Sequence, residues 1–266
     1  TLALEVGDVL EQMAQVALVA ALETGHDDPP LRVAPPPVGR VLFVGSHTES
    51  VHMAPTTFIE LAMALAWEGL DVDVIPFGQS LHAADIDADA LDMVVVLPVV
   101  DYPSLEGDPK TYDEAWSPPE VAALEDYVYA GGLLVLTNSA HRLKYGNRVL
   151  DPNEDWSDTN ALAEQFGFSY QEGDLMGDQG STEGDHMLVD GVALLEMAEA
   201  NGVPFTMGEG VVLARASGAP IAGLVDHGDA GGQVLALADV GILGAGWGEP
   251  VNLPFWRNLA RYAPSR

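Results

Sequence analysis

Short runs of consecutive apolar residues recur along the chain and alternate with segments whose apolar residues are spaced three or four apart. Residues 41–44, 93–97 and 133–136 are continuously apolar, which is typical of strands buried on both faces of a parallel sheet. After the first run, residues 58–65 have helical spacing, and Gly69 predicts the end of that helix. Val72, Val74 and Ile75 predict the next strand. This alternation predicts right-handed crossovers and a mostly parallel sheet.

A helix start precedes the apolar run at residues 133–136. In residues 117–120 (Ser-Pro-Pro-Glu) the serine can cap free backbone N–H groups, proline suits the first helical position, and the glutamate closes a capping box. The last third predicts shorter strands at residues 211–214, 221–225 and 234–238, and then an amphipathic helix around residues 255–262. Residues 174–186 are acidic and glycine-containing, and they predict a solvated loop rather than a calcium site.

The N-terminal residues differ from the rest. Residues 3–25 carry an apolar stripe at helical spacing, and a proline-rich connector follows. We therefore predict a helical arm and connector at residues 1–39 and a single α/β domain at residues 40–266. Such an arm is expected to dock on its own domain, on a protein partner or on a second copy of the chain. Because the first residue is Thr rather than Met, we expect processing or trimming upstream of it.

The charge balance restricts partners and location. The chain has 41 acidic and 10 basic residues, a net charge of −31. This charge repels phosphate backbones and anionic lipids, so we expect no nucleic-acid partner, and no apolar run is long enough to span a bilayer. So many carboxylates with so few lysines suit a halophilic-type surface, although an ordinary acidic protein from a GC-rich genome has a similar composition. We expect an extracytoplasmic location or the cytoplasm of a high-salt organism.

Several segments, in this order, resemble the class I glutamine amidotransferase-like superfamily. The similarity is to its branch without amidotransferase activity, the domain type shared with intraflagellar-transport and gliding-motility proteins and with uncharacterised bacterial domains. The motifs are Gly45-Ser46-His47, the helix at 119–128 with Gly131-Gly132 and the strand at 133–136, the stretch from His186 to Val192, the strand from Gly232 to Asp239, and Asn252 to Asn258. This resemblance implies a doubly wound flavodoxin-like or amidotransferase-like three-layer sandwich over about residues 40–263.

The chain departs from the amidotransferases at the residue that performs their chemistry. Those enzymes carry a nucleophilic cysteine on the sharp turn after the strand that corresponds to residues 133–136. Here that turn is Thr137-Asn138-Ser139-Ala140-His141, and the chain contains no cysteine. Glutamine amidotransfer, disulfides and thiolate metal sites are therefore excluded. The glycine-rich segments also lack the strand–turn–helix arrangement that cradles phosphates, so no nucleotide cofactor is expected.

Polar residues that follow the predicted strands form the candidate site, because ligands bind at the carboxyl ends of strands in doubly wound sheets. Ser139 and His141 permit a serine hydrolase, although the Gly-x-Ser-x-Gly elbow is absent and the sequence favours a polar turn that caps the following helix. Two histidines and a carboxylate, His47, Glu49 and His52, permit a metal site, although ordinary loop histidines have the same spacing. The expected ligand-binding residues are Ser46, His47, Glu49, His52, Asp101, Asn138, Ser139 and His141.

Three functions remain open from the sequence. The first is a non-catalytic ligand-binding or protein-interaction domain, favoured because the fold pattern is present and the nucleophilic cysteine is missing. The second is a serine- or metal-dependent hydrolase that uses the same crevice. The third is a structural subunit of a larger assembly, suggested by the N-terminal arm. The sequence leans away from an enzyme and names no ligand.

Overall fold

The computed structural model describes residues 38–47, 61–62, 64–76, 78–99, 115–138, 144–145, 148–149, 156–171, 179–197, 202–244 and 251–265. Nearly all of the predicted N-terminal arm lies outside these ranges, so its docking stays a prediction. None of the helices in the described ranges is long and apolar enough to cross a membrane.

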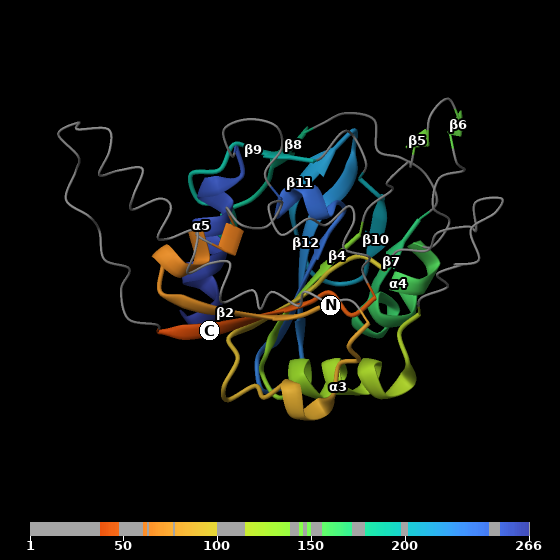
Figure 1. Cartoon of the computed structure of the whole chain (residues 1–266). Helices are drawn as coiled ribbons and strands as arrows, with labels where there is room; N and C mark the ends of the chain where they lie inside the picture. Colours follow the sequence, from red (N-terminus) through yellow and green to blue (C-terminus); the bar gives the residue numbers. More distant parts are fainter. Residues whose placement is uncertain are drawn as a thin grey trace, which may run out of the picture. The chain divides into compact units, whose positions relative to one another are not determined.

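A nine-stranded sheet organises the domain (Figure 1). Its first five strands are mutually parallel and include all three continuously apolar runs. The remaining strands pair antiparallel with their neighbours. In spatial order the strands are β2 (Leu70–Ile75), β1 (Gly39–Val44), β3 (Met93–Val96), β4 (Leu133–Thr137), β13 (Gly232–Leu237), β12 (Ala219–His227), β11 (Val211–Ala216), β8 (Gln179–Thr182) and β9 (Leu194–Glu196).

The α/β class and the large sheet are therefore confirmed, but only half of the strand pairings are parallel, so the sheet is mixed. Two strands of this sheet, β8 and β9, were not predicted, and β8 lies inside the segment expected to be a solvated loop. The reason is local: β8 reads Gln-Gly-Ser-Thr and β9 has three residues, so neither offers an apolar run or an alternation. Gly180 fits there because an added Cβ would lie 2.5 Å from the backbone oxygen of Arg215.

Helices α3 (Pro118–Tyr129) and α5 (Leu253–Tyr262) begin and end close to where the sequence predicts, and α4 (Trp156–Ala163) lies between them in the chain. The capping box of α3 is confirmed. The Ser117 side chain accepts the Glu120 backbone N–H, and the Glu120 carboxylate accepts the Ser117 backbone N–H. After α4 and the short 3₁₀ turn η2 (Glu164–Phe166), Gly167 takes a left-handed conformation and leads into β7 (Phe168–Tyr170). β7 pairs with β10 (Phe205–Met207), and two-residue strands β5 (Lys144–Tyr145) and β6 (Arg148–Val149) form a separate pair.

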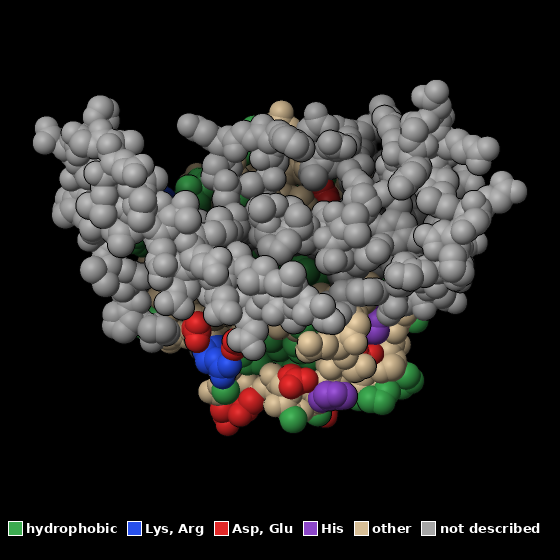
Figure 2. Space-filling model, viewed as in Figure 1, with side chains coloured by type: hydrophobic (Ala, Val, Ile, Leu, Met, Phe, Trp, Pro, Cys, Tyr) green, Lys and Arg blue, Asp and Glu red, His purple; other side chains and the backbone are tan. Residues whose placement is uncertain are grey.

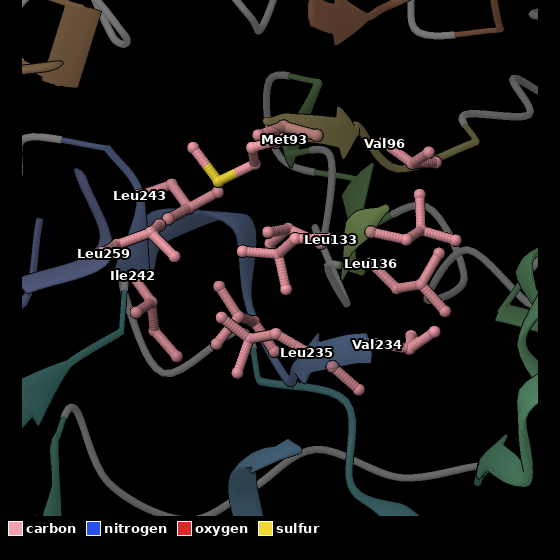
Figure 3. Close-up of a cluster of buried hydrophobic side chains, with 14 of the residues drawn as sticks. Met93, Val96, Leu133, Leu136, Val234, Leu235, Ile242, Leu243 and Leu259 are labelled. Atoms are coloured by element: carbon pink, nitrogen blue, oxygen red, sulfur yellow. The ribbon is translucent and has the colours of Figure 1, made fainter. Parts of the chain in front are cut away.

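Apolar side chains from the middle of the sheet pack together with the segment before the C-terminal helix and with that helix itself. The strand register places Met93 and Leu133 side by side. Figure 3 shows these two residues and Leu235 converging with Leu243 and Leu259. All five side chains are fully buried or nearly so. At about 25 cal/mol per Å² of buried apolar surface, this layer is a principal source of stability.

The asparagines at the start of the last helix and within it have structural roles. Asn252 accepts a hydrogen bond from the Glu196 backbone N–H at 2.9 Å and donates to the backbone oxygens of Glu196 and Ile242 at 2.9 and 3.1 Å. Trp256 donates its indole N–H to the same Ile242 oxygen at 2.8 Å, and Asn258 donates to two further backbone oxygens. These bonds fasten α5 to β9 and to the 3₁₀ turns η3 (Met187–Val189) and η5 (Val240–Ile242).

Close packing explains a second motif. A Cβ added to Gly232 would lie 1.7 Å from the backbone oxygen of Val128, so only glycine allows β13 to approach α3 at this point. At the other end of the same motif, Asp239 is fully buried and accepts a hydrogen bond from Gly241 N–H, which caps η5. The motif from Gly232 to Asp239 thus fixes a strand at both of its ends.

Three arginines at the described surface are paired with acidic side chains. Arg40 bonds to Asp73, Arg215 bonds to Glu183 at 3.1 Å, and Arg261 bonds to Glu68 through two nitrogens at 2.8 and 2.9 Å. In the visible part of one face, basic side chains lie against acidic ones (Figure 2). These pairs are exposed, so each contributes at most about 1 kcal/mol and leaves most of the negative charge uncompensated.

Candidate functional site

The carboxyl ends of the parallel strands lie in one row. Val44 is level with Val96, and Val96 is level with Leu136. The chain leaves β1 toward β2 on one side, whereas β3 leads through α3 to β4 on the other side. The ends of β1 and β3 therefore flank the topological switch point, where doubly wound sheets place their ligands.

Buried polar side chains concentrate at this row. The described residues include eight buried polar or charged residues, and five of them follow a parallel strand or begin the helix beside it. Thr137 donates its hydroxyl to the Val96 backbone oxygen at 2.8 Å. The backbone oxygen of Asn138 accepts the Val240 backbone N–H at 2.7 Å. The five are Ser46, Glu120, Thr137, Asn138 and Asp239.

Glu120 is the centre of the most connected part of this edge. It is only 3% exposed. Its carboxylate accepts the Ser117 hydroxyl at 2.6 Å, the Ser117 backbone N–H at 3.0 Å and the Leu81 backbone N–H at 3.1 Å. His47 Nε2 lies 3.2 Å from both carboxylate oxygens. The side chain thus joins the end of β1, the chain before the 3₁₀ turn η1 (Ala83–Asp85) and the first turn of α3.

The ionisation of Glu120 follows from this environment. Burial alone would raise the pKa of the carboxyl group. The hydrogen bonds from Ser117 and Leu81, together with His47, outweigh that effect and leave the pKa of Glu120 below its ordinary value. Glu120 is therefore a carboxylate at neutral pH, and because a carboxylate only accepts, His47 must donate through Nε2.

An aromatic ring also contacts His47. The Trp116 ring meets the His47 ring edge-on, with centroids 4.7 Å apart and planes at 70°. Trp116 immediately precedes Ser117, so a single short segment supplies both the ring and the capping hydroxyl. His47 is thereby fixed in orientation by a carboxylate and an indole from the same helix start.

Two buried donors beside His47 remain unmatched. Within the described part of the chain, the Ser46 hydroxyl and the Trp116 indole N–H have no hydrogen-bond partner, although these residues are 3% and 6% exposed. Leaving a buried polar group unsatisfied costs about 1–3 kcal/mol. One further side chain of this kind, Thr159 in α4, lies on another element. Unmatched donors beside an oriented histidine are what a polar ligand would satisfy.

The structure describes three of the eight predicted site residues. Ser46 and His47 follow β1 and Asn138 follows β4, so all three belong to the carboxyl-edge row, as the strand pattern predicts, with the end of β3 between them. The other five lie outside the described residues, so both the serine-hydrolase set and the metal set stay predictions. Across the described ranges, no three His, Asp or Glu side chains gather closely enough to hold a metal ion. The five residues are Glu49, His52, Asp101, Ser139 and His141.

Sequence reasoning missed Glu120, Trp116 and Leu81 as members of this site. The signal for Glu120 was present, since it lies in the first turn of the helix between β3 and β4 in the chain, but the capping box gave the residue a complete structural explanation. Leu81 contributes only its backbone N–H, which no sequence pattern reveals. Trp116 is one of five tryptophans scattered along the chain, and no motif distinguishes it from the others.

Known proteins resemble this chain in structure only. No protein-family model matches it, and no curated protein matches it. The mmIFT52 N-terminal domain matches with a TM-score of 0.55 and 12% identity, over 77% of this chain and 88% of that domain. The cytoplasmic protein STM1381 from Salmonella typhimurium LT2 matches with a TM-score of 0.54 and 17% identity, over 84% and 98%. The cytoplasmic protein STM3548 from Salmonella typhimurium gives 0.52 and 14%, over 85% and 98%.

At 12 to 17% identity these likenesses show the fold and nothing of the activity. The expected resemblance to a domain of intraflagellar-transport proteins is confirmed at the level of the fold. The chain is thus similar to an α/β domain that occurs in proteins of different kinds.

Proposed function

We propose that this domain binds a small polar ligand at the carboxyl edge of its parallel strands, in the crevice next to His47, without transforming it. The observation that carries the proposal is the pair of buried donors on Ser46 and Trp116 that are unmatched within the described residues. Ser46 precedes His47 in the chain, the Trp116 ring contacts the His47 ring, and Glu120 holds His47 in place. The proposal includes the finer classification as a three-layer sandwich of the amidotransferase-like, non-amidotransferase branch, to which the mmIFT52 likeness lends support.

Binding explains the arrangement better than packing does. In a site with only a structural role, a buried hydroxyl and a buried indole N–H would be matched by backbone oxygens, as Trp256 and Asn252 are. Ser46 and Trp116 contribute cost without a matching bond inside the described residues. A ligand atom that accepts hydrogen bonds from these two side chains recovers the free energy lost by burying them unmatched. Binding is therefore selective for molecules that carry such an acceptor.

A ligand screen tests the proposal. Thermal-shift measurements with sugars, amino acids and divalent ions on the wild-type protein are expected to give a stabilising ligand. The same ligand is expected to lose its effect on Ser46→Ala and to keep it on Thr159→Val, which removes an equally unmatched hydroxyl on α4. Equal stabilisation of wild type and Ser46→Ala would refute the proposed site.

A serine hydrolase is the second candidate, because His47 and Glu120 form the histidine–carboxylate pair that such enzymes use to orient their base. Ser139, on the segment that follows β4, is the nucleophile that this mechanism requires. Hydrolysis of an ester substrate that is lost in both Ser139→Ala and His47→Gln would favour this candidate over binding alone. A metal-dependent hydrolase would instead lose activity with a chelator.

A structural role in an assembly, through the N-terminal arm, also stays a proposal. The mmIFT52 likeness is compatible with protein interaction. Sedimentation of the full chain distinguishes this role, because a monomer at all concentrations would remove self-assembly through the arm.

A further inference from the structure

The donors at the site restrict the chemistry of the molecule that would bind there. An indole N–H only donates, so the ligand must present an acceptor to Trp116. A metal ion or an ammonium group offers no acceptor and is therefore unsuitable. Because the Ser46 hydroxyl can donate as well, the two side chains together favour a ligand rich in hydroxyl or carbonyl oxygens.

The charge next to these donors decides between neutral and anionic acceptors. The Glu120 carboxylate is 3.2 Å from His47 Nε2, and the centroid of the His47 ring is 4.7 Å from that of the Trp116 ring. Only the His47 side chain, which contacts both, therefore separates a negative charge from the Trp116 ring. Water is largely excluded from this carboxylate, so its field is screened less than that of a surface charge. The net charge of −31 acts in the same direction.

We infer that the ligand is an uncharged molecule that offers a hydroxyl or carbonyl oxygen to Ser46 and Trp116, and that Glu120 makes the site reject carboxylates and phosphates. This inference rests on the proposed function, since it requires that a ligand binds there. Glu120 then has two roles: it caps α3 and orients His47, and its charge sets the selectivity.

Matched neutral and anionic probes test this directly on the full chain. Acetamide and acetate are a neutral and an anionic probe of nearly the same shape. Glycerol and glycerol phosphate are a second such pair, which differ by the phosphate group alone. The readout is the indole N–H signal of Trp116 in a ¹⁵N-correlation spectrum, identified among the five tryptophans by its loss in Trp116→Phe. Acetamide and glycerol are expected to move this signal saturably, whereas the two anions at equal ionic strength bind at least about tenfold more weakly.

Two variants locate the effect. Ser46→Ala is expected to weaken the response to acetamide, and Thr159→Val is expected to leave it unchanged. Glu120→Gln is expected to raise the affinity for acetate by about tenfold relative to acetamide. Should Glu120→Gln fail to fold, the wild-type comparison of neutral and anionic probes still decides the selectivity.

The outcomes separate the inference from the proposed function. If the anions bind as well as the neutral probes, or better, the inference is wrong while a ligand site remains. If Glu120→Gln folds and keeps the wild-type preference, Glu120 is not its source. If none of the four probes moves the Trp116 signal, the inference and the proposed site both fail.

Discussion

Asn252 and Ser46 are both about 3% exposed, yet they use their polar atoms in different ways. Asn252, at the start of α5, makes three hydrogen bonds to backbone atoms of neighbouring segments. The Ser46 hydroxyl, at the end of β1, makes none to any described residue. Asn252 connects elements of the fold, whereas the Ser46 hydroxyl connects none of the described ones.

The residues around Asn252 and Ser46 differ in the same way, in whether their buried polar atoms are hydrogen-bonded. Around α5, the Trp256 indole is matched by a backbone oxygen, whereas the Trp116 indole at the carboxyl edge is unmatched within the described ranges. Natural proteins keep local costs of this kind mainly where function requires them. The comparison therefore supports a structural role for the α5 end and agrees with the ligand binding proposed for the carboxyl edge, and each role has a measurable consequence.

Salt gives the largest expected effect and acts on both regions alike. The few arginine pairs leave most of the 41 acidic residues uncompensated, so self-repulsion is strong at low ionic strength. At molar salt the Debye length is about 3 Å, so we expect stability to rise by roughly 4 kcal/mol, or about 10 °C in Tm. Melting curves from tens of millimolar to molar KCl measure this. A flat midpoint would mean that the charges are well spread or bind ions, and the halophilic interpretation would be dropped.

Asn252→Ala tests the structural side of the comparison. The change removes three hydrogen bonds and leaves the Glu196 and Ile242 backbone groups unmatched, so we expect a loss of about 3 kcal/mol in the free energy of unfolding. Urea denaturation of wild type and variant measures it. Because these bonds are buried, the loss should be the same at low and high salt. A cost below about 1 kcal/mol would contradict the role assigned to α5.

Glu120→Gln tests the junction between the two kinds of region, because Glu120 is both a cap and a site residue. We expect a loss of about 2 kcal/mol at pH 7, since the variant removes a carboxylate that accepts several hydrogen bonds. The pKa of Glu120 is lowered in the folded state, so the carboxylate contributes its full stability above about pH 4.5 and loses it as the pH falls through the folded pKa.

The pH series is best read as the difference between wild type and Glu120→Gln. That difference should be constant near neutral pH and shrink only below about pH 4.5. Burial lowers the pKa of His186, and Asp226 partly offsets this effect. The neutral His186 therefore stabilises the fold, and the protein loses this contribution on acidification, starting near pH 6.5. His186 is present in both proteins and cancels in the difference. A difference that persists unchanged at pH 3 would show that Glu120 acts through shape rather than charge.

The parallel strands were predictable because burial on both faces demands continuous apolar runs, as at residues 93–97 and 133–136. The α3 capping box was predictable because both partners are three residues apart. The edge strands β8 and β9 were not, since their register depends on pairing with β11 and on contacts with α5, which are distant in sequence.

The candidate site was predictable only in its outline. Strand ends placed Ser46, His47 and Asn138 at one edge, because parallel strands end together. The pairing of His47 with Glu120 joins residues 73 positions apart, and the role of the Leu81 backbone N–H depends on a loop conformation. A hydrogen bond between elements so distant in sequence leaves no periodicity to detect.

The smallest predicted effect is the most direct test of the comparison. Ser46→Ala removes a buried hydroxyl that is unmatched within the described residues, so the unliganded protein should keep its stability or gain up to about 1 kcal/mol. Thr159→Val makes the same kind of change in α4 and nearly conserves volume, so it should be equally neutral or stabilising. Urea denaturation of the two variants beside wild type gives both values. If Ser46→Ala costs more than about 1 kcal/mol while Thr159→Val does not, then the hydroxyl bonds within the fold and the carboxyl edge is structural after all. If both changes are neutral and only Ser46→Ala abolishes ligand stabilisation, then the cost at Ser46 serves binding, because the matched change in α4 has removed the same group without the same consequence.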